Sequence, residues 1–548
     1  GTLAFVSQSG AFGAMMYAQA TEAGVGCSSF TSVGNEAEAE FSDFVGYLLD
    51  APETQVIGGY LEGARDGDKL RRVAEKALEL QKPILILKVG RTGAGARAAS
   101  SHTGSLAGDD QIYDAFFRQM GIVRIEALPD LTAFAILHRS GKECPGRRVA
   151  ILGGSGGQGV LLADRCERLG LSVPEITGAT RERLEQCLPE FASARNPIDL
   201  TAQGGRDTST WGKCLRALVD DPGIDVVLAQ AFFRKEVGIR VAEELVEICQ
   251  STPKLVVLMM HHRDDSEFVR KCIAMVEGAG IPILGDGLQA ADAVAKLCWY
   301  HEKVSQVREA GSRPPQILPG EGVDALMRSS DPLSEFQCKR ILSCYGIPIT
   351  SEGLATDAET AVEQARELGY PVALKIQSGE ILHKTEAGGI RLDLESDDAV
   401  RAAYQEVVAS AKQFSPGAAI QGVLVQEMLT DGVEVIIGTT RDPVFGQVIM
   451  FGLGGIFVEA LRDVSFRIAP VTRKDAEEMI QEIKGHRVLR GMRGKPPADV
   501  DAIVDAILRV SQLVTDYADE IEELDINPLV VFSEGAKAVD ALVTRRRT

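Results

Sequence analysis

Residues 147–170 read RRVAILGGSGGQGVLLADRCERLG, and this stretch decides the fold class of the chain. The apolar run Val149–Leu152 predicts a buried β-strand, and the glycine-rich turn Gly153–Gly159 leads into residues with helical spacing. A strand, a glycine turn and a helix in this order form the first part of a βαβ unit. The stretch therefore predicts a parallel sheet covered by helices.

The same order recurs on both sides of this stretch. Before it, the strand-like runs TLAFV, QVIGGYLE and PILILKV alternate with helices expected from about residue 11, over 71–80 and around 112–120. After it, LSVPE, IDVVLAQ, KLVVLMM and IPILG alternate with helices, the last of which is expected to end near residue 305. We therefore predict two doubly wound α/β domains, over 1–140 and 145–305.

The rest of the chain differs in composition and in its pattern of predicted strands and helices. EAGSRPPQILPGEGVD is rich in proline, glycine and charge and predicts a linker over 306–330. From 331 to 548, helices alternate with hairpin-like strands such as GVLVQEM and GVEVIIGTTRDPVFGQVIMFGLGG. This pattern predicts a third, α+β domain with antiparallel pairing.

Composition excludes several classes of function. The 548 residues carry a net charge of −20, which disfavours nucleic-acid binding, and no apolar run approaches the ~20 residues of a membrane span. The ten cysteines form no C-x-x-C pair, as expected of reduced thiols in the cytoplasm. The chain begins with GTLAFVS inside a predicted strand, so we expect it to be a fragment.

The glycine turn at 153–159 fits two motifs, and neither is specific. It matches the dinucleotide pattern G-x-G-x-x-G, with Glu175 as a candidate ribose ligand, and also the nucleophile-elbow pattern G-x-S-x-G centred on Ser155. Both share a helix N-terminus, whose free amides and partial positive charge attract an anion. Residues 7–11, SQSGA, predict a second such N-terminus. Neither turn has the Lys-Ser/Thr ending of a P-loop.

His102 lies among small residues in SSHTGSLAG, residues 100–108. Small neighbours allow an external group to approach closely, so the histidine is either an incidental part of a flexible loop or a nucleophile for a compact ligand. Local sequence alone favours the incidental loop.

Eight motifs in order along the chain resemble one family. They are VSQSGAFG, YLEG, LKVGRTGAGARAASSHTGSLAG, GGSGGQGVLLADRCERLGL, ARNPIDLTA, LKIQSGEILHKTEAGGI, GLGGIFVEALRD and ELDINPLVV. Together they resemble the ADP-forming (NDP-forming) acyl-CoA synthetases, relatives of succinyl-CoA synthetase. The resemblance implies two flavodoxin-like domains followed by an ATP-grasp domain. It also implies an acid-thiol ligase that converts a carboxylic acid, CoA and ATP to acyl-CoA, ADP and phosphate through an acyl phosphate and a phosphohistidine.

The resemblance assigns roles to residues of the first two domains. His102 takes the position of the phosphorylated histidine, and Glu62 in YLEG that of the glutamate which orients it. A carboxylate on one imidazole nitrogen fixes the tautomer that leaves the other nitrogen nucleophilic. The phosphate is then expected between two helix N-termini. The residues expected to bind it are Ser9, Gly10, Ser155, Gly156 and Gly157.

The third domain is expected to bind ATP and Mg²⁺. The residues implied to bind the nucleotide are Lys375, Lys384, Gly388, Gly389, Gln426, Glu427 and Glu434. Asn527 and Asp540 match magnesium ligands, as oxygen donors suited to a hard cation that bridges phosphates. His383, beside Lys384, fits either a second phosphoryl carrier or a phosphate clamp, and both interpretations stay open.

The relatives carry a CoA-binding domain before the strand that corresponds to TLAFV, and this chain shows none. We expect that domain to be missing from the sequence or to belong to another polypeptide, with loss of CoA chemistry as a third possibility. The substrate implied is a small carboxylic acid, and a homodimer is expected. Two alternative functions remain at this point: a regulatory ligase-like module of a protein acetyltransferase, and a non-catalytic ATP-responsive binding protein.

Overall fold

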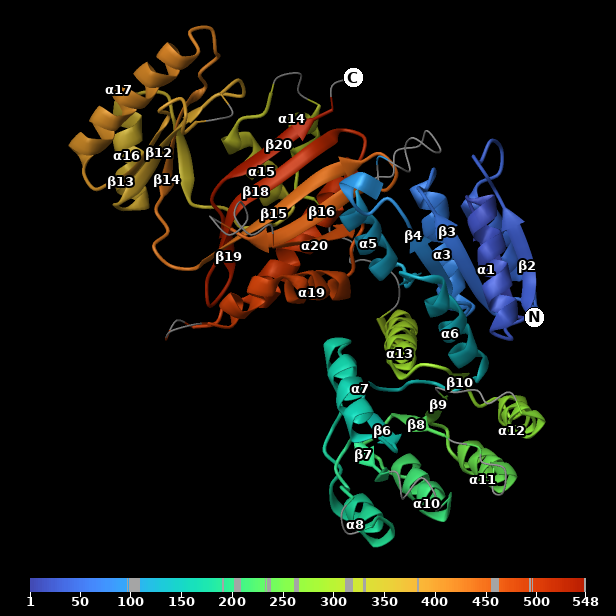
Figure 1. Cartoon of the computed structure of the whole chain (residues 1–548). Coiled ribbons are helices and arrows are strands. Elements are labelled where there is room, and N and C mark those ends of the chain that lie inside the picture. The colour runs from blue at the N-terminus through green and yellow to red at the C-terminus, as the bar shows by residue number, and fades with distance from the viewer. Residues whose placement is uncertain are drawn as a thin grey trace. The chain divides into compact units, whose positions relative to one another are not determined.

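A computed structural model describes residues 1–95, 97, 109–189, 192–201, 208–231, 233, 238–260, 266–310, 319–328, 332–381, 384–454, 463–491, 494 and 496–546 (Figure 1). The chain divides into two compact units. The first comprises Gly1–Asp110 and Met120–Gly311, and the second comprises Gln111–Gln119 and Ser312–Thr548. Within the described ranges, no helix combines the length and the apolar character that crossing a bilayer requires.

The first sheet of the first unit is parallel throughout, with strand order β2-β1-β3-β4-β5. Its strands are β1 (Leu3–Ser7), β2 (Cys27–Ser32), β3 (Val56–Leu61), β4 (Ile84–Lys88) and β5 (Val123–Arg124). Its helices in this unit are α1 (Gly10–Glu22), α2 (Phe41–Asp50), α3 (Gly67–Glu79) and α6 (Leu128–Arg139). The central strands β1 and β4 are buried along their whole length, as their continuous apolar sequence predicts.

The second sheet of this unit is also parallel, with order β10-β9-β8-β6-β7. Its strands are β6 (Val149–Gly153), β7 (Ile198–Asp199), β8 (Val226–Gln230), β9 (Leu255–Met259) and β10 (Ile283–Leu284). Its helices are α7 (Gly156–Arg168), α8 (Gly178–Cys187), α10 (Thr208–Val219), α11 (Gly238–Ser251), α12 (Glu267–Gly278) and α13 (Gly287–Ala310). The two doubly wound α/β folds predicted from the sequence are confirmed.

One predicted strand of this sheet is wrong. LSVPE contributes only an isolated bridge between Ser172 and Arg148, and the strand beside β6 is β7 instead. Asn196, just before β7, explains this edge: its side-chain amide accepts a hydrogen bond from the Ile151 amide and donates to the carbonyls of Val149 and Pro174. The Asn196 side chain thus ties both neighbouring segments to β6.

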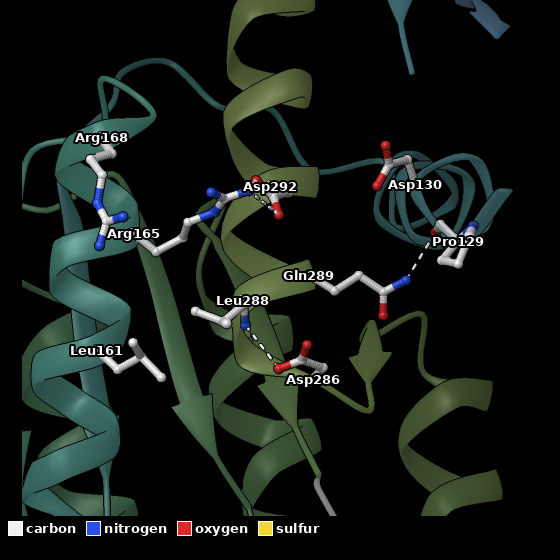
Figure 2. Close-up of a pocket in the computed structure, with 9 residues that line it drawn as sticks. All are labelled: Pro129, Asp130, Leu161, Arg165, Arg168, Asp286, Leu288, Gln289 and Asp292. Carbon is white, nitrogen blue, oxygen red and sulfur yellow. Dashed lines mark hydrogen bonds and ion pairs between the residues drawn. The ribbon is translucent and has the colours of Figure 1, made fainter. Parts of the chain in front are cut away.

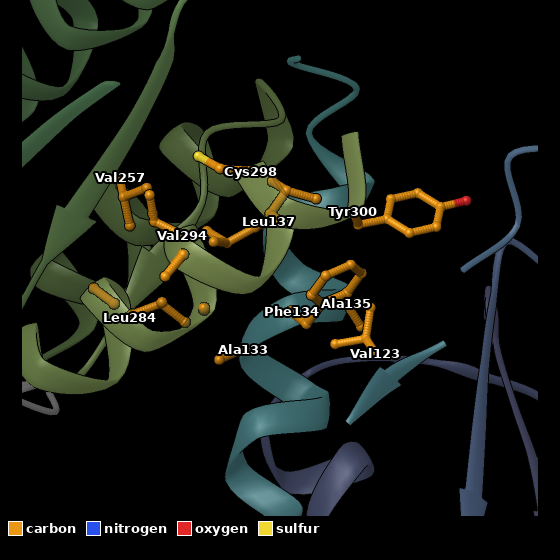
Figure 3. Close-up of a cluster of buried hydrophobic side chains, with 14 of the residues drawn as sticks. Val123, Ala133, Phe134, Ala135, Leu137, Val257, Leu284, Val294, Cys298 and Tyr300 are labelled. Atoms are coloured by element: carbon orange, nitrogen blue, oxygen red, sulfur yellow. The ribbon is translucent and has the colours of Figure 1, made fainter. Parts of the chain in front are cut away.

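Helices α6 and α13 join the two sheets into one core (Figure 3). Phe134 and Leu137 of α6 and Val294 and Cys298 of α13 are almost completely buried in one hydrophobic cluster, which extends to strand residues of both sheets. Continuous apolar burial of this kind holds the first unit together.

This helix pair makes stability depend on pH. His138, on α6, stacks on Phe134 and meets the edge of Tyr300, and burial lowers the pKa of His138 to about 4, with a smaller contribution from His301. Between pH 6.5 and about 4 the unfolded chain binds a proton that the folded chain excludes, so stability is lost as pH falls through this range, by up to about 3 kcal/mol. Below about pH 4 this loss is complete.

We expect His138→Gln to reduce by about one the number of protons linked to unfolding near pH 5.5. Urea unfolding of the first unit at closely spaced pH values measures this number. An unchanged pH dependence in the variant would contradict the assignment to His138.

The second unit contains two antiparallel sheets. The first has order β11-β14-β12-β13, from β11 (Glu352–Ala355), β12 (Val372–Gln377), β13 (Ile390–Leu394) and β14 (Gly422–Glu427). The second has order β17-β16-β15-β18-β19, with β20 also paired to β18; these strands are β15 (Val433–Asp442), β16 (Gly446–Leu453), β17 (Val464–Ile468), β18 (Ile521–Val531), β19 (Ala536–Ala538) and β20 (Ala541–Arg545). The helices are α14 (Val323–Met327), α15 (Glu335–Cys344), α16 (Ala358–Leu368), α17 (Asp397–Phe414), α19 (Arg473–Glu482) and α20 (Val500–Asp516). The predicted antiparallel α+β region is confirmed.

Helix α5 (Asp110–Gln119) is the exception to sequence order, because its residues 111–119 belong to the second unit. The ring of Phe116 stacks on Phe445, which lies in the β15–β16 turn, at a centroid distance of 4.5 Å, and Tyr113 meets Phe445 edge-on at 4.9 Å. Gln119 completes the contact with hydrogen bonds to the backbone of Ile468 on β17.

Candidate functional site

Two opposite charges lie at the carboxyl ends of adjacent strands in the first unit. Glu62 follows β3 directly and is 5% exposed, while Lys88, 2% exposed, ends β4 and pairs in register with Leu61. The Gln8 side chain accepts a hydrogen bond from the Glu62 amide at 2.5 Å. Burial lowers the pKa of Lys88 to about 8. The predicted residue Glu62 is therefore held at the sheet edge where doubly wound folds bind ligands.

The hydroxyl of the neighbouring Tyr60 forms a hydrogen bond with the Glu62 side chain. Burial raises the pKa of Tyr60, and the Glu62 carboxylate, which is hydrogen-bonded to it, raises it further. The tyrosine thus stays a neutral donor to Glu62.

The two predicted helix N-termini differ in how they are capped. At α1, the Ser9 hydroxyl accepts a hydrogen bond from the Phe12 amide at 3.4 Å, and Gly10 is exposed. At α7, the N-cap Ser155 makes no such side-chain bond, and Gly156 and Gly157 are exposed. The first amides of α7 therefore remain available to a ligand.

Glycine leaves room for a neighbouring carboxylate at the start of α7. A Cβ atom on Gly156 would lie 2.8 Å from Oδ2 of Asp199, the last residue of the neighbouring strand β7. A carboxylate thus already stands beside this helix N-terminus, where it is favoured by the helix dipole.

In the second unit, the two lysines predicted to bind the nucleotide contact the same carboxylate. Lys375 on β12 donates to Oε1 of Glu335 at 2.9 Å and to the Val539 carbonyl at 3.1 Å. Lys384, in the turn before β13, forms an ion pair with Oε2 of Glu335 at 2.9 Å. Both ammonium groups also lie within 4 Å of the Asp540 carboxylate, at 3.7 and 3.6 Å.

A third lysine connects this cluster to β14. Lys339 is completely buried, and its ammonium group donates to Gln426 Oε1 at 3.3 Å and to the Val539 carbonyl at 3.1 Å. It also pairs with Glu352 on β11. Gln426, predicted beside the adenine, is therefore fixed by the same network that holds Lys375.

The glycine turn after Lys384 is tightly built. The Gly389 amide donates to the Lys384 carbonyl at 2.8 Å, and Gly388 has a φ of 63°, in the left-handed region. A Cβ atom on Gly389 would approach Ile376 to 2.5 Å. This turn therefore needs glycine at both positions.

The remaining predicted residues of this unit lie on neighbouring strands. Glu427 pairs with Lys537 at 2.7 Å and accepts from the Ser351 amide, and these contacts outweigh burial to lower the pKa of Glu427. Glu434 is exposed on β15. Neither contacts the lysine cluster through any hydrogen bond described in this unit.

The predicted metal ligands are adjacent. The Asn527 amide donates to the Asp540 carbonyl at 3.3 Å, Asn527 is exposed, and the Asp540 side chain is 32% exposed. Asp525, two residues before Asn527, has its pKa raised to about 6 by burial and by Glu523 and Asp540. Among the described residues, no group of three or more His, Cys, Asp or Glu side chains is placed to hold a metal ion.

Two of the predicted residues are not among those that the structure describes, and the structure adds residues that the sequence did not suggest. His102 and His383 lie outside the described residues. Glu335, Lys339, Glu352 and Lys88 were not singled out. The only signal for the first two was their i, i+4 spacing, which is also typical of a solvated helix face.

A pocket of about 570 Å³ lies elsewhere in the first unit, between α6, α7 and α13 (Figure 2). Some of the polar groups that line it bind one another. Arg165 pairs with Asp292 at 2.7 Å, and Gln289 donates a hydrogen bond to the Pro129 carbonyl at 2.9 Å. Among the described residues, none of those predicted for function lines this pocket.

Three known domain families match three successive parts of the chain. Residues 1–137 match the succinyl-CoA ligase-like flavodoxin domain, residues 149–247 the ligase-CoA domain and residues 324–544 the ATP-grasp domain.

Two relatives match nearly the whole length of this chain, and a third matches 40% of it. An ADP-forming acetate–CoA ligase I of Archaeoglobus fulgidus is 37% identical over 98% of this chain and 77% of the relative. An ADP-forming 4-hydroxybutyrate–CoA ligase of Nitrosopumilus maritimus is 33% identical over 98% of this chain and 76% of the relative. The β subunit of an ADP-forming acetate–CoA ligase II of Pyrococcus furiosus is 47% identical over 40% of this chain and 94% of the subunit.

Proposed function

The chain belongs to the ADP-forming acyl-CoA synthetase family, and from that premise we propose which residues carry its reaction. The enzyme is an acid-thiol ligase that uses ATP and CoA and releases ADP and phosphate. The observation that carries the proposal is the convergence of Lys375 and Lys384 on one carboxylate beside Asp540. Two lysines and a carboxylate in this arrangement suit a nucleotide polyphosphate.

We assign His102 as the phosphoryl acceptor and Glu62 as its orienting carboxylate. An imidazole nitrogen of His102 attacks the γ-phosphorus of ATP, the bond to the ADP oxygen breaks, and a phosphohistidine forms. The carboxylate of the acid substrate then takes this phosphoryl group, and the thiol of CoA displaces phosphate from the acyl phosphate. The buried position of Glu62 beside Tyr60 and Lys88 supports its role as a fixed hydrogen-bond acceptor.

The oxygen donors of the second unit fit a magnesium ion. Mg²⁺ is commonly held by one or two protein oxygens together with water and substrate phosphates, and Asn527 and Asp540 supply such a pair next to the lysines. Bound there, the ion would neutralise phosphate charge.

The finer assignments of partners are also proposals. CoA is held by a domain upstream or on a separate chain, which is supported by a relative that is divided into subunits. The acid is a small carboxylic acid, since the relatives act on acetate and 4-hydroxybutyrate. All ten cysteines are free thiols, which supports a cytoplasmic location. We propose a homodimer as the assembly.

Labelling with γ-³²P-ATP tests the assignment of His102. We expect an acid-labile, base-stable label that maps, after digestion with trypsin at alkaline pH, to the peptide 98–118, whose one histidine is His102. The peptide 376–384 contains His383 and is separated in the same digest. Label on both peptides would support a relay through His383. Label on 376–384 alone, or no label, would overturn the assignment.

A further inference from the structure

Glu335 is the centre of the lysine cluster, although no prediction included it. It is the first residue of α15, where Ser334 and Gln337 form a capping box, and its side chain is completely buried. Its Oε1 accepts a hydrogen bond from Lys375 at 2.9 Å and lies 3.2 Å from the ammonium group of Lys339, and its Oε2 forms an ion pair with Lys384 at 2.9 Å. One carboxylate therefore joins three ammonium groups.

The two lysines come from different kinds of structure. Lys375 lies inside β12, which is paired on both sides, whereas Lys384 lies in the turn between β12 and β13. Their side chains are 7% and 13% exposed, so both can reach a ligand, while the fully buried Lys339 cannot. Without an anion between them, like charges at this separation repel each other.

Charge and hydrogen bonding keep Glu335 ionised. Burial alone would raise the pKa of Glu335, but Lys375, Lys339 and Lys384 outweigh it and hold this pKa well below its usual range. Lys339 contributes an ion pair at 3.2 Å and is itself anchored by Glu352, Thr350 and the Val539 carbonyl. The carboxylate is thus a fixed negative charge, available before any ligand binds.

We propose that Glu335 is a positioning residue that holds Lys375 and Lys384 together in the geometry that binds the nucleotide phosphates. It acts through the two lysines and has no contact with the adenine in this scheme. The inference rests on the nucleotide site proposed above. An amide at this position can accept a hydrogen bond through one oxygen alone, so Glu335→Gln releases one of the two lysines.

Binding of ADP and of adenosine to the full chain, measured by calorimetry, tests the proposal. We expect Glu335→Gln to weaken ADP binding by about tenfold or more and to leave adenosine binding unchanged, because the lysines are assigned to the phosphates. Glu335→Asp should recover part of the ADP affinity. Glu482→Gln is the matched control: it also removes a carboxylate that pairs with a buried cation of this unit, Arg467, but one that receives neither Lys375 nor Lys384, so ADP affinity should be retained.

The other outcomes distinguish failure of the inference about Glu335 from failure of the proposed nucleotide site. Equal weakening of ADP and adenosine, or equal loss in Glu335→Gln and Glu482→Gln, would show a merely structural role and overturn the inference. Unchanged ADP affinity in Glu335→Gln would also overturn it. If the unaltered chain binds ADP no better than adenosine, the proposed nucleotide site itself fails, and the inference falls with it.

Discussion

A Lys375→Met variant is expected to form the phosphoenzyme from ATP about 10²–10³ times more slowly than the unaltered chain, with its fold intact. Lys375 is 6% exposed on a central strand, so its charge acts with little screening by water. Methionine fills a similar volume but removes the charge and all donors. The rate of label incorporation at saturating ATP measures the effect.

The structure explains why the variant should still fold. Glu335 keeps the ammonium groups of Lys339 and Lys384, and the Val539 carbonyl keeps its hydrogen bonds from Lys339 and Gln426. No buried charge is therefore left alone. Lys412→Met, on the exposed face of α17, is the matched control and should label at the normal rate. Normal labelling of Lys375→Met would remove Lys375 from the proposed site.

The sequence predicted the buried parallel strands well, because their burial on both faces leaves a continuous apolar run. ILILK at β4 is an example. It did not reveal β2, CSSFTS, since this strand lies at the sheet edge, is only partly buried and is polar. The wrong strand at LSVPE has the opposite cause: its residues are apolar enough, but the tertiary contacts of Asn196 give the edge position to β7.

The sequence indicates candidate site residues where a motif is present, and it gives no signal where only packing brings residues together. Lys375 and Lys384 came from motif resemblance, and the structure brings them together. Glu335 and Lys339 form an i, i+4 pair that local sequence cannot distinguish from a surface pair; only the packing of α15 among β11, β12 and β20 buries it. Burial turns a pair of small energetic value into the fixed charge of a candidate site.

Helix α5 shows a second limit of sequence reasoning. It follows the segment that carries His102, and sequence order places it in the first domain. Its partner Ile468 is 349 residues away in the chain, so no local pattern reveals the contact. The side chain of Gln119 makes the two backbone hydrogen bonds that a neighbouring strand would make. Its amide nitrogen donates to the Ile468 carbonyl at 2.9 Å, and its oxygen accepts from the Ile468 amide at 3.0 Å.

Gln119→Met is therefore expected to destabilise the second unit by about 2–4 kcal/mol, because both backbone groups of Ile468 lose their partner in a buried place. Gln119 is 7% exposed, so water cannot readily replace the lost bonds. Unfolding by urea measures the loss, and hydrogen exchange should show reduced protection of the Ile468 amide. Gln481→Met, at an exposed position of α19 in the same unit, is the control and should change stability by less than about 0.5 kcal/mol. Equal stability of the two variants would mean that the aromatic contacts of Tyr113 and Phe116 with Phe445 hold α5 in place without Gln119.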